Sequence, residues 1–127
     1  MPKFDKYSIK DLKMFLYNSY DHDAKLEKVT YDCEKDIMII KLLNSIFNVQ
    51  IIYTFYNIEM TLAMKGNEYG CRETIISSTV EENTVYLQNY LKNSEKNNED
   101  FVYLVFQMFS GDELHIVSKE VDIEIIR

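Results

Sequence analysis

The chain has 127 residues, a formal net charge of −7, two cysteines and no tryptophan. A chain of this length can bury a sufficient core without disulfides, so we expect a single domain over residues 1–127. Phosphate recognition needs a basic face, and the negative charge therefore argues against a nucleic-acid-binding role. Because the two cysteines form no CxxC pair, a reducing compartment is favoured over a secreted disulfide framework.

The sequence has neither the pattern of a secretory signal nor that of a membrane span. Charged residues recur throughout residues 1–20 and leave no apolar segment of the length that a signal peptide needs. The densest apolar stretch, Ile37–Tyr56, is interrupted by Lys41 and several polar residues, whereas a membrane span needs about 20 mainly apolar residues. We therefore expect a cytoplasmic protein with no membrane partner.

Charge is distributed unevenly along the chain. Residues 1–20 hold four lysines and two aspartates, while residues 93–127 hold eight acidic and three basic residues. The acidic C-terminal third could steer a protein partner with a basic surface. The simpler interpretation is a solvated acidic surface that aids solubility.

The first predicted element is an amphipathic helix. Residues Ser8 to Asp11 have the spacing of a capping box, with aspartate in place of the usual glutamate. Apolar residues then recur at steps of three and four up to about Tyr20 and lie on one side of the helix: Ile9, Leu12, Phe15, Leu16 and Tyr20. So short a helix is marginal alone, so it must bury this stripe against a sheet.

After the helix the apolar period changes to that of a strand. Ala24 and Leu26 alternate on one face of this strand, whereas Val29 and Tyr31 alternate on the opposite parity. A bulge near Lys28 would bring both pairs onto the same face. A polar turn over residues 32–36 precedes Ile37–Leu43, which is apolar enough for a central strand.

The clearest strand pattern is the alternating apolar set Phe47, Val49, Ile51, Tyr53 and Phe55. Asn57 interrupts this pattern, and the alternation resumes on the opposite parity from Ile58 to Met64.

The middle of the chain is less regular. Residues 65–72 contain Gly66 and Gly70 and predict a loop. Thr74–Val80 is β-branched and predicts a strand. Val85–Lys92 fits either a strand or a helical stripe, and we favour the strand. Residues 93–100 contain no apolar side chain, which predicts a solvated loop.

The chain ends in a predicted hairpin. Phe101–Phe109 is apolar on both faces, as an interior strand would be, and Ser110–Glu113 supplies turn residues. The closing strand, to Ile125, alternates with acidic residues and should have one solvent-facing side. One helix and six to eight strands with short connections predict an α+β fold: the N-terminal helix packs on a curved, mainly antiparallel sheet or partly open barrel.

The densest group of potential metal ligands is Asp21-His22-Asp23, and His115 is the other histidine. His22, Asp23 and His115 are weak metal candidates because no HExxH or paired-cysteine spacing supports them. The alternative is that Asp21 or Asp23 accepts backbone hydrogen bonds at the helix-to-strand turn. His115 alternates with Leu114 and Ile116 and should face away from their core. No metal and no cofactor is predicted.

Neither cysteine has the signature of a catalytic nucleophile. Cys33 lies between Asp32 and Glu34, whose negative charges would raise the pKa of its thiol, whereas Cys71 lies beside Arg72 and is the more plausible reactive thiol. No nucleophile-elbow, dinucleotide or P-loop pattern is present. We therefore assign no catalytic residue and expect that the protein is not an enzyme.

Tyrosine is unusually frequent, with ten copies beside seven phenylalanines. Residues that fall in predicted strands could line a concave face and stack on a ligand or protein partner: Tyr53, Tyr56, Tyr86, Tyr90 and Tyr103. The alternative is compositional bias combined with the preference of aromatic residues for strands.

Two short segments carry a resemblance. The run Tyr20-Asp21-His22-Asp23-Ala24 and the hairpin from Phe109 to Ile116 resemble small bacterial α+β proteins of unassigned function. Some of these proteins are similar to immunity proteins of polymorphic toxin systems. The resemblance implies a non-catalytic protein that binds and blocks a toxin domain, and it brings no catalytic residues.

Three hypotheses of function follow. The leading one is a non-catalytic protein-interaction module, with toxin neutralisation as its sharpest form. The second is a small-molecule-binding half-barrel, whose rim would be residues 65–72. The third is a metal- or cysteine-dependent enzyme. An exposed edge strand, whose location the sequence does not give, could also pair two copies of the chain.

Overall fold

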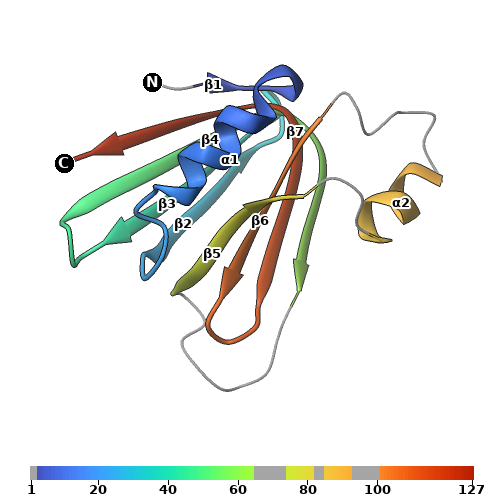
Figure 1. Cartoon of the computed structure of the whole chain (residues 1–127). Coiled ribbons are helices and arrows are strands. Elements are labelled where there is room, and N and C mark those ends of the chain that lie inside the picture. The colour runs from blue at the N-terminus through green and yellow to red at the C-terminus, as the bar shows by residue number, and fades with distance from the viewer. Residues whose placement is uncertain (1–2, 65–73, 82–84, 93–100) are drawn as a thin grey trace.

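The computed structural model describes residues 3–64, 74–81, 85–92 and 101–127. It has the predicted α+β class: a short N-terminal helix packs on an antiparallel sheet that is not closed (Figure 1). The helical elements are a 3-10 helix η1 (Lys6–Ser8), α1 (Ile9–Tyr17) and α2 (Val85–Lys92). The strands are β1 (Lys3–Phe4), β2 (Lys25–Asp32), β3 (Ile37–Asn44), β4 (Val49–Met64), β5 (Ile75–Val80), β6 (Val102–Met108) and β7 (Glu113–Ile126).

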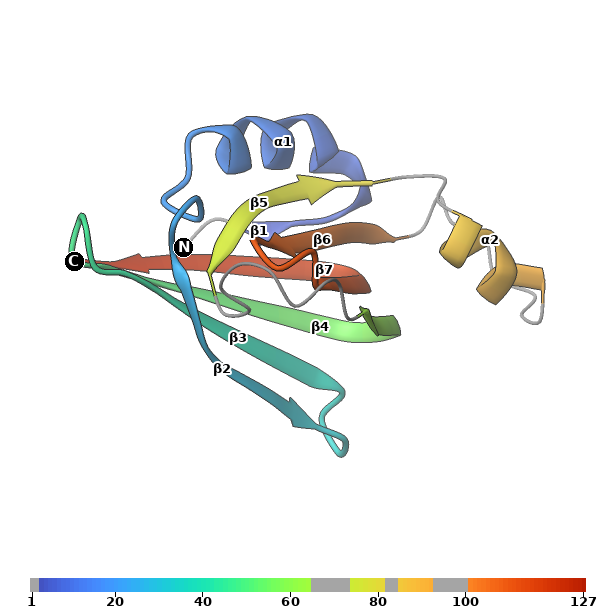
Figure 2. The same ribbon diagram turned by 90° about the horizontal axis from the view of Figure 1, so that it is seen from below.

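The sheet has the order β2-β3-β4-β7-β6-β5, and β1 pairs separately with β7. It curls so that β5 rises beside α1 (Figure 2). At one end its two edges touch, since Thr74 forms an isolated bridge with Lys25 and the Ile75 N–H donates to the Ala24 carbonyl at 2.7 Å. The result is a sheet rolled toward a barrel around the side chains beneath α1.

Helix α1 presents the predicted stripe to the sheet. Leu12 and Leu16 are buried, and Ile9 and Phe15 pack at the margin of the same core. The helix ends at Tyr17, earlier than predicted, so Tyr20 packs on this core from the turn that follows. The predicted capping box is wrong in position. Ser8 makes no side-chain cap on α1; its hydroxyl instead accepts the Asp5 N–H at 2.9 Å, and Asp5 caps η1. The chain already forms a helical turn from Lys6, so Asp5 and Ser8 make the capping box of η1.

The predicted strand over Val85–Lys92 is wrong, because this segment is helix α2. Leu87 is 1% exposed, and Tyr90 lies three residues further along the helix. Both pack on a second apolar cluster, which includes residues of β6 and β7. Val85, whose alternation with Leu87 favoured a strand, is 64% exposed. Helical spacing therefore buries the two residues that have a surface to pack against.

Both predicted interruptions of strand parity coincide with shifts in the register of the sheet. The β2–β3 register shifts between Leu26 and Lys28, and the β4–β7 register shifts between Ile58 and Met60. Asn57, just before the second bulge, has a φ of 56°, a left-handed conformation that asparagine tolerates better than most residues.

Phe47 is not part of the alternating strand face that the sequence predicted. It lies in the β3–β4 turn and is 65% exposed. The cause is Asn44, whose side-chain oxygen accepts the N–H groups of Ile46 and Phe47 at 3.0 and 3.2 Å and forms an Asx turn. Strand β4 then begins at Val49, and the remaining apolar residues of that face are buried.

The core lies on both sides of the sheet. The main cluster fills the side covered by α1 (the α1 side) and contains Leu104 and Phe106 of β6. The second cluster lies on the opposite side, beneath α2 (the α2 side), and contains Tyr103 and Val105 of the same strand. Strand β6 is therefore apolar on both faces, as predicted. The predicted loops over residues 65–72 and 93–100 lie outside the described residues.

Candidate functional site

The five candidate tyrosines occupy three separate places and do not form one concave face. Tyr53 and Tyr56 are three residues apart on β4, so their side chains point to opposite sides of the sheet. Tyr103 lies on β6 on the α2 side, and Tyr86 and Tyr90 belong to helix α2 rather than to a strand. That these residues bind a ligand or partner stays a prediction.

Tyr53 lies inside the main core and offers no surface to a ligand. Its side chain is fully buried, and the Phe106 ring meets it edge-on at a centroid distance of 5.0 Å. Its hydroxyl donates a short hydrogen bond to Asp21 Oδ2, and Ser78 Oγ donates to the same oxygen at 2.5 Å. The Asp21 carboxylate thus joins the helix-to-strand turn to β4 and β5 through side-chain hydroxyls, while the Asp21 carbonyl accepts the Ala24 N–H at 2.9 Å within the turn.

The Asp21 carboxyl is 2% exposed, and its second oxygen, Oδ1, has no hydrogen-bond partner among the described residues. Burial raises the pKa of Asp21 above its ordinary value of 3.8, although the hydrogen bonds from Ser78 and Tyr53 oppose this rise.

This buried carboxyl predicts a pH dependence of stability. Since the folded-state pKa is raised, the folded protein holds the proton more tightly than the unfolded chain. The contribution of Asp21 is therefore fully present below pH 3.8 and lost as the pH rises through the folded-state pKa. Urea unfolding from pH 4 to pH 8 should show the free energy of unfolding falling relative to that of Asp21→Asn. A constant difference between the two proteins would contradict this.

Tyr56 belongs to a polar cluster on the α2 side of β4 and β7. Its hydroxyl donates to Asp122 Oδ2 at 3.1 Å, and burial, followed by this carboxylate, raises the pKa of Tyr56. Lys3 lies 5.0 Å from the centre of the Tyr56 ring and 3.2 Å from Glu120 Oε2. The acidic side of β7 is thus partly covered: Glu120 and Glu124 are half-buried and Asp122 is 8% exposed.

His115 is the centre of a hydrogen-bonded chain beneath α2. Its Nδ1 lies 2.6 Å from the Tyr103 hydroxyl and its Nε2 lies 2.8 Å from Glu113 Oε1. The Tyr86 ring meets the imidazole edge-on at 5.2 Å, and the Tyr90 hydroxyl donates to Glu59 at 2.6 Å. His115 faces away from the Leu114 and Ile116 core, as predicted, but it is buried in a second one. A carboxylate–histidine–hydroxyl chain can pass protons. Here, however, His115 and Tyr103 are only 3% and 2% exposed, and they hold α2 in place.

The weak metal candidates do not share a site. His22 and Asp23 lie 3.6 Å apart at an exposed turn, and the His22 ring lies near Phe109. His115 has a different set of neighbours beneath α2. In the described parts of the chain, no three His, Cys, Asp or Glu side chains are grouped so as to hold a metal ion. Cys33 is exposed in the β2–β3 turn, and Cys71 with its neighbour Arg72 lies outside the described residues.

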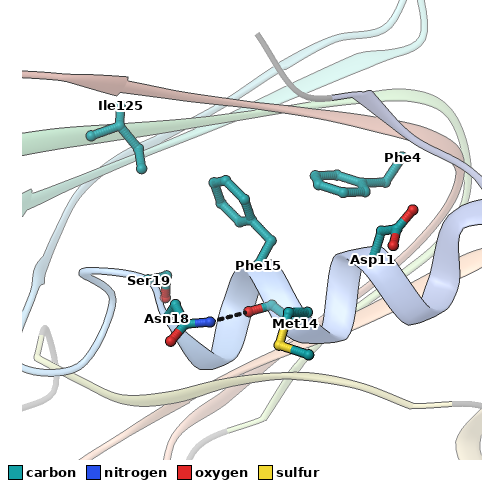
Figure 3. A pocket seen from close by; sticks show the side chains of 7 residues that line it. All are labelled: Phe4, Asp11, Met14, Phe15, Asn18, Ser19 and Ile125. Carbon is teal, nitrogen blue, oxygen red and sulfur yellow. Dashed lines mark hydrogen bonds between the residues drawn. The ribbon is translucent and has the colours of Figure 1, made fainter.

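The sequence reasoning missed a groove beside α1. It has a volume of about 410 Å³ and lies between α1, β1 and the end of β7. The Phe4 and Phe15 rings stand between the helix and the strands, with centroids 5.6 Å apart (Figure 3). The groove is open and mainly apolar, with Asp11 at one end, and is lined by Phe4, Asp11, Met14, Phe15, Asn18, Ser19 and Ile125.

Three large side chains of η1 and α1 project into solvent. Tyr7, Met14 and Tyr17 are 85%, 61% and 88% exposed. Met14 and Tyr17 are three residues apart and form an exposed stripe on the side of α1 away from the buried Leu12 and Leu16. Tyr7 belongs to η1, the turn that precedes α1. Met14 belongs to both this stripe and the groove. We call the stripe and the groove together the α1 surface. The second stripe is visible in the sequence as the three-residue spacing of Met14 and Tyr17, and that signal could have located it.

The geometry defines an α+β protein in which an N-terminal helix covers one side of a curled, open antiparallel sheet and carries an exposed apolar surface. No protein family matches the chain, and neither a curated protein nor a solved structure shows significant similarity to it. Within the described residues, no helix combines the length and apolar character needed to cross a membrane.

Proposed function

We propose that this protein is a non-catalytic, cytoplasmic module that binds another protein through the α1 surface. The observation that carries the proposal is the exposure of Met14 and Tyr17 on one side of α1, and of Tyr7 in the preceding turn, together with an apolar groove that Met14 lines. Contiguous apolar surface that stays exposed on a folded domain marks sites of association. Tyrosine and methionine are also enriched where protein interfaces are buried most completely.

The polar clusters support a binding role rather than catalysis. The Asp21 cluster and the His115 chain each join several elements, and their central side chains are buried. The small-molecule alternative places a ligand among the tyrosines, but Tyr53 is enclosed by Phe55 and Phe106. The α1 surface offers both an open groove and large exposed side chains.

The partner that fits best is a protein domain with an apolar contact patch for the α1 surface and a basic surface away from that patch, because residues 1–20, which carry most of the α1 surface, hold four lysines and two aspartates. The net charge of −7 would attract such a domain at long range and speed the encounter. The residues of the α1 surface would then supply the short-range contact. A toxin domain neutralised by an immunity-type protein is the specific form of this proposal, and it rests on the resemblance of the two short sequence segments.

The proposal predicts that polar substitutions on the α1 surface weaken partner binding without unfolding the protein. The products of the neighbouring genes would be purified, and binding to the full chain measured by calorimetry. Central interface residues contribute about 2 kcal/mol each, so Met14→Ser and Tyr17→Ser should each weaken binding by about 30-fold. Val85→Ser is the matched control, since Val85 is 64% exposed on α2.

Two outcomes contradict the proposal. In the first, both α1 variants bind a partner as tightly as the unchanged protein does. In the second, no neighbouring product is retained and the purified protein turns over a substrate.

A further inference from the structure

Strand β2 forms one edge of the sheet and presents a side that is open to pairing. It is the terminal strand and pairs with β3. In the described part of the chain, the other backbone pairing of β2 is the single bridge between Lys25 and Thr74. From this bridge the strand runs away from β5 and α1 (Figure 2). Every residue from Glu27 to Asp32 is exposed. Such an edge offers a row of N–H and C=O groups to a further strand.

The bulge confines regular pairing to one segment. The β2–β3 register shifts between Leu26 and Lys28, and from Lys28 to Asp32 the ladder is regular. A partner strand can therefore follow residues 28–32 without a matching irregularity.

The two faces of this segment carry different chemistry. Val29 and Tyr31 lie opposite Ile40 and Met38, so they are on the α1 side, where they are 45% and 51% exposed. The alternate residues are Lys28, Thr30 and Asp32, which point to the other side of the sheet.

We propose that two copies of this chain pair antiparallel through β2, about a two-fold axis at Thr30. In this register Lys28 of each copy lies opposite Asp32 of the other, Val29 lies opposite Tyr31, and Thr30 lies opposite itself. All the pairs are favourable types: opposite charges, an aromatic with a β-branched residue, and two threonines. A two-fold contact repeats each unlike pair, so it contains two ion pairs and two apolar pairs.

The neighbouring registers lack this complementarity. An axis at Val29 or at Tyr31 would oppose Thr30 to Lys28 or to Asp32 and leave the charges without opposite partners. An edge lysine normally discourages strand pairing. In the Thr30-centred register Lys28 lies opposite Asp32 of the other copy. The same charges that disfavour the neighbouring registers therefore favour this one. A second copy is therefore the occupant that fits the edge.

The contact is short, so we expect a weak, concentration-dependent dimer. The contact uses no residue of the α1 surface, so the test of this dimer is independent of the test of the proposed partner. The full chain would be studied by sedimentation equilibrium over a concentration series at low salt.

The decisive variant is Lys28→Glu. It converts both ion pairs into repulsive pairs. Each pair loses about 0.2–1 kcal/mol of attraction and gains a repulsion of about the same size, so the dissociation constant should rise about tenfold. Lys35→Glu is the matched control, because Lys35 is exposed in the adjacent turn and makes the same change in net charge. Equal weakening by the two variants would overturn the proposal, as would a wild-type protein that stays monomeric at the highest concentration.

Mixing variants tests the register itself. Each copy of Lys28→Glu presents two acids and each copy of Asp32→Lys presents two bases, so each variant alone should dimerise about tenfold more weakly than the unchanged protein. A mixture should form the heterodimer, in which unlike charges meet at both contacts; failure to do so with both proteins folded overturns the register. Asp32 also accepts the N–H groups of Glu34 and Lys35 at 3.1 and 3.2 Å, so a melting curve must confirm that its variant folds. If Asp32→Lys does not fold, the comparison of Lys28→Glu with Lys35→Glu decides the proposal.

Discussion

Phe106→Ala is expected to lower the free energy of unfolding by about 4 kcal/mol. Phe106 is 1% exposed on β6 and meets Tyr53 and Phe55 edge-on, at centroid distances of 5.0 and 6.4 Å. Removing the ring loses the transfer free energy of its carbons and the aromatic contacts, and it leaves a cavity between the strands. The strands around this position are paired on both sides, so they cannot collapse to fill the cavity.

Chemical denaturation would measure this loss, with Phe47→Ala as the control. Phe47 is 65% exposed in the β3–β4 turn, so its replacement should change the free energy of unfolding by no more than about 0.5 kcal/mol. A similar change for both variants would mean that the Tyr53–Phe55–Phe106 cluster is not the centre of the core. Phe106→Leu should fall between the two, because it keeps part of the buried volume.

The elements that were predicted correctly are those whose pattern depends on one large buried surface. The helical stripe through Leu12 and Leu16 and the alternation along β4 both face the main core, so their periods are unambiguous. The register shift near Lys28 was visible for the same reason, because Leu26 and Val29 can both lie on the α1 side only if an extra residue is inserted. The shift beyond Asn57 has a different effect, since Met60 packs on the cluster of the α2 side.

Helix α2 was not predictable because its buried surface is small and is supplied by distant segments. Leu87 and Tyr90 pack on a cluster that includes Tyr103 and Val117 of β6 and β7. Local propensity could not separate the two periods in a segment with so few apolar residues, and tertiary packing decided the outcome.

The polar clusters were beyond sequence reasoning for a different reason. Asp21 is separated by 32 residues from Tyr53 and by 57 from Ser78, and nothing in their spacing indicates a contact. The Asp21–Asp23 turn was singled out as a ligand-like group. The structure shows that one of its carboxylates points into the core while Asp23 stays exposed. The α1 surface, in contrast, is written locally in the sequence, as a second stripe on a helix that already had one.

Leu12→Ala is expected to loosen α1 selectively. Leu12 is fully buried and, with Leu16, provides the buried contact that holds the helix on the sheet. Its truncation should cost about 3 kcal/mol. Since α1 lies outside the strand ladder, we expect the loss to appear first as local opening of the helix. Amide exchange in α1 should then accelerate about 100-fold, while amides in β3 and β4 should accelerate less.

The same variant links stability to the proposed function. Met14 and Tyr17 keep their side chains in Leu12→Ala, but the helix that fixes their positions is no longer held, so partner binding should weaken although no contact residue is changed. Lys10→Ala, on the exposed side of α1, is the control and should leave helix exchange and stability nearly unchanged. If amides throughout the sheet accelerated as much as those of α1, the helix would be part of a single cooperative unit. The α1 surface could then be lost only when the whole domain unfolds.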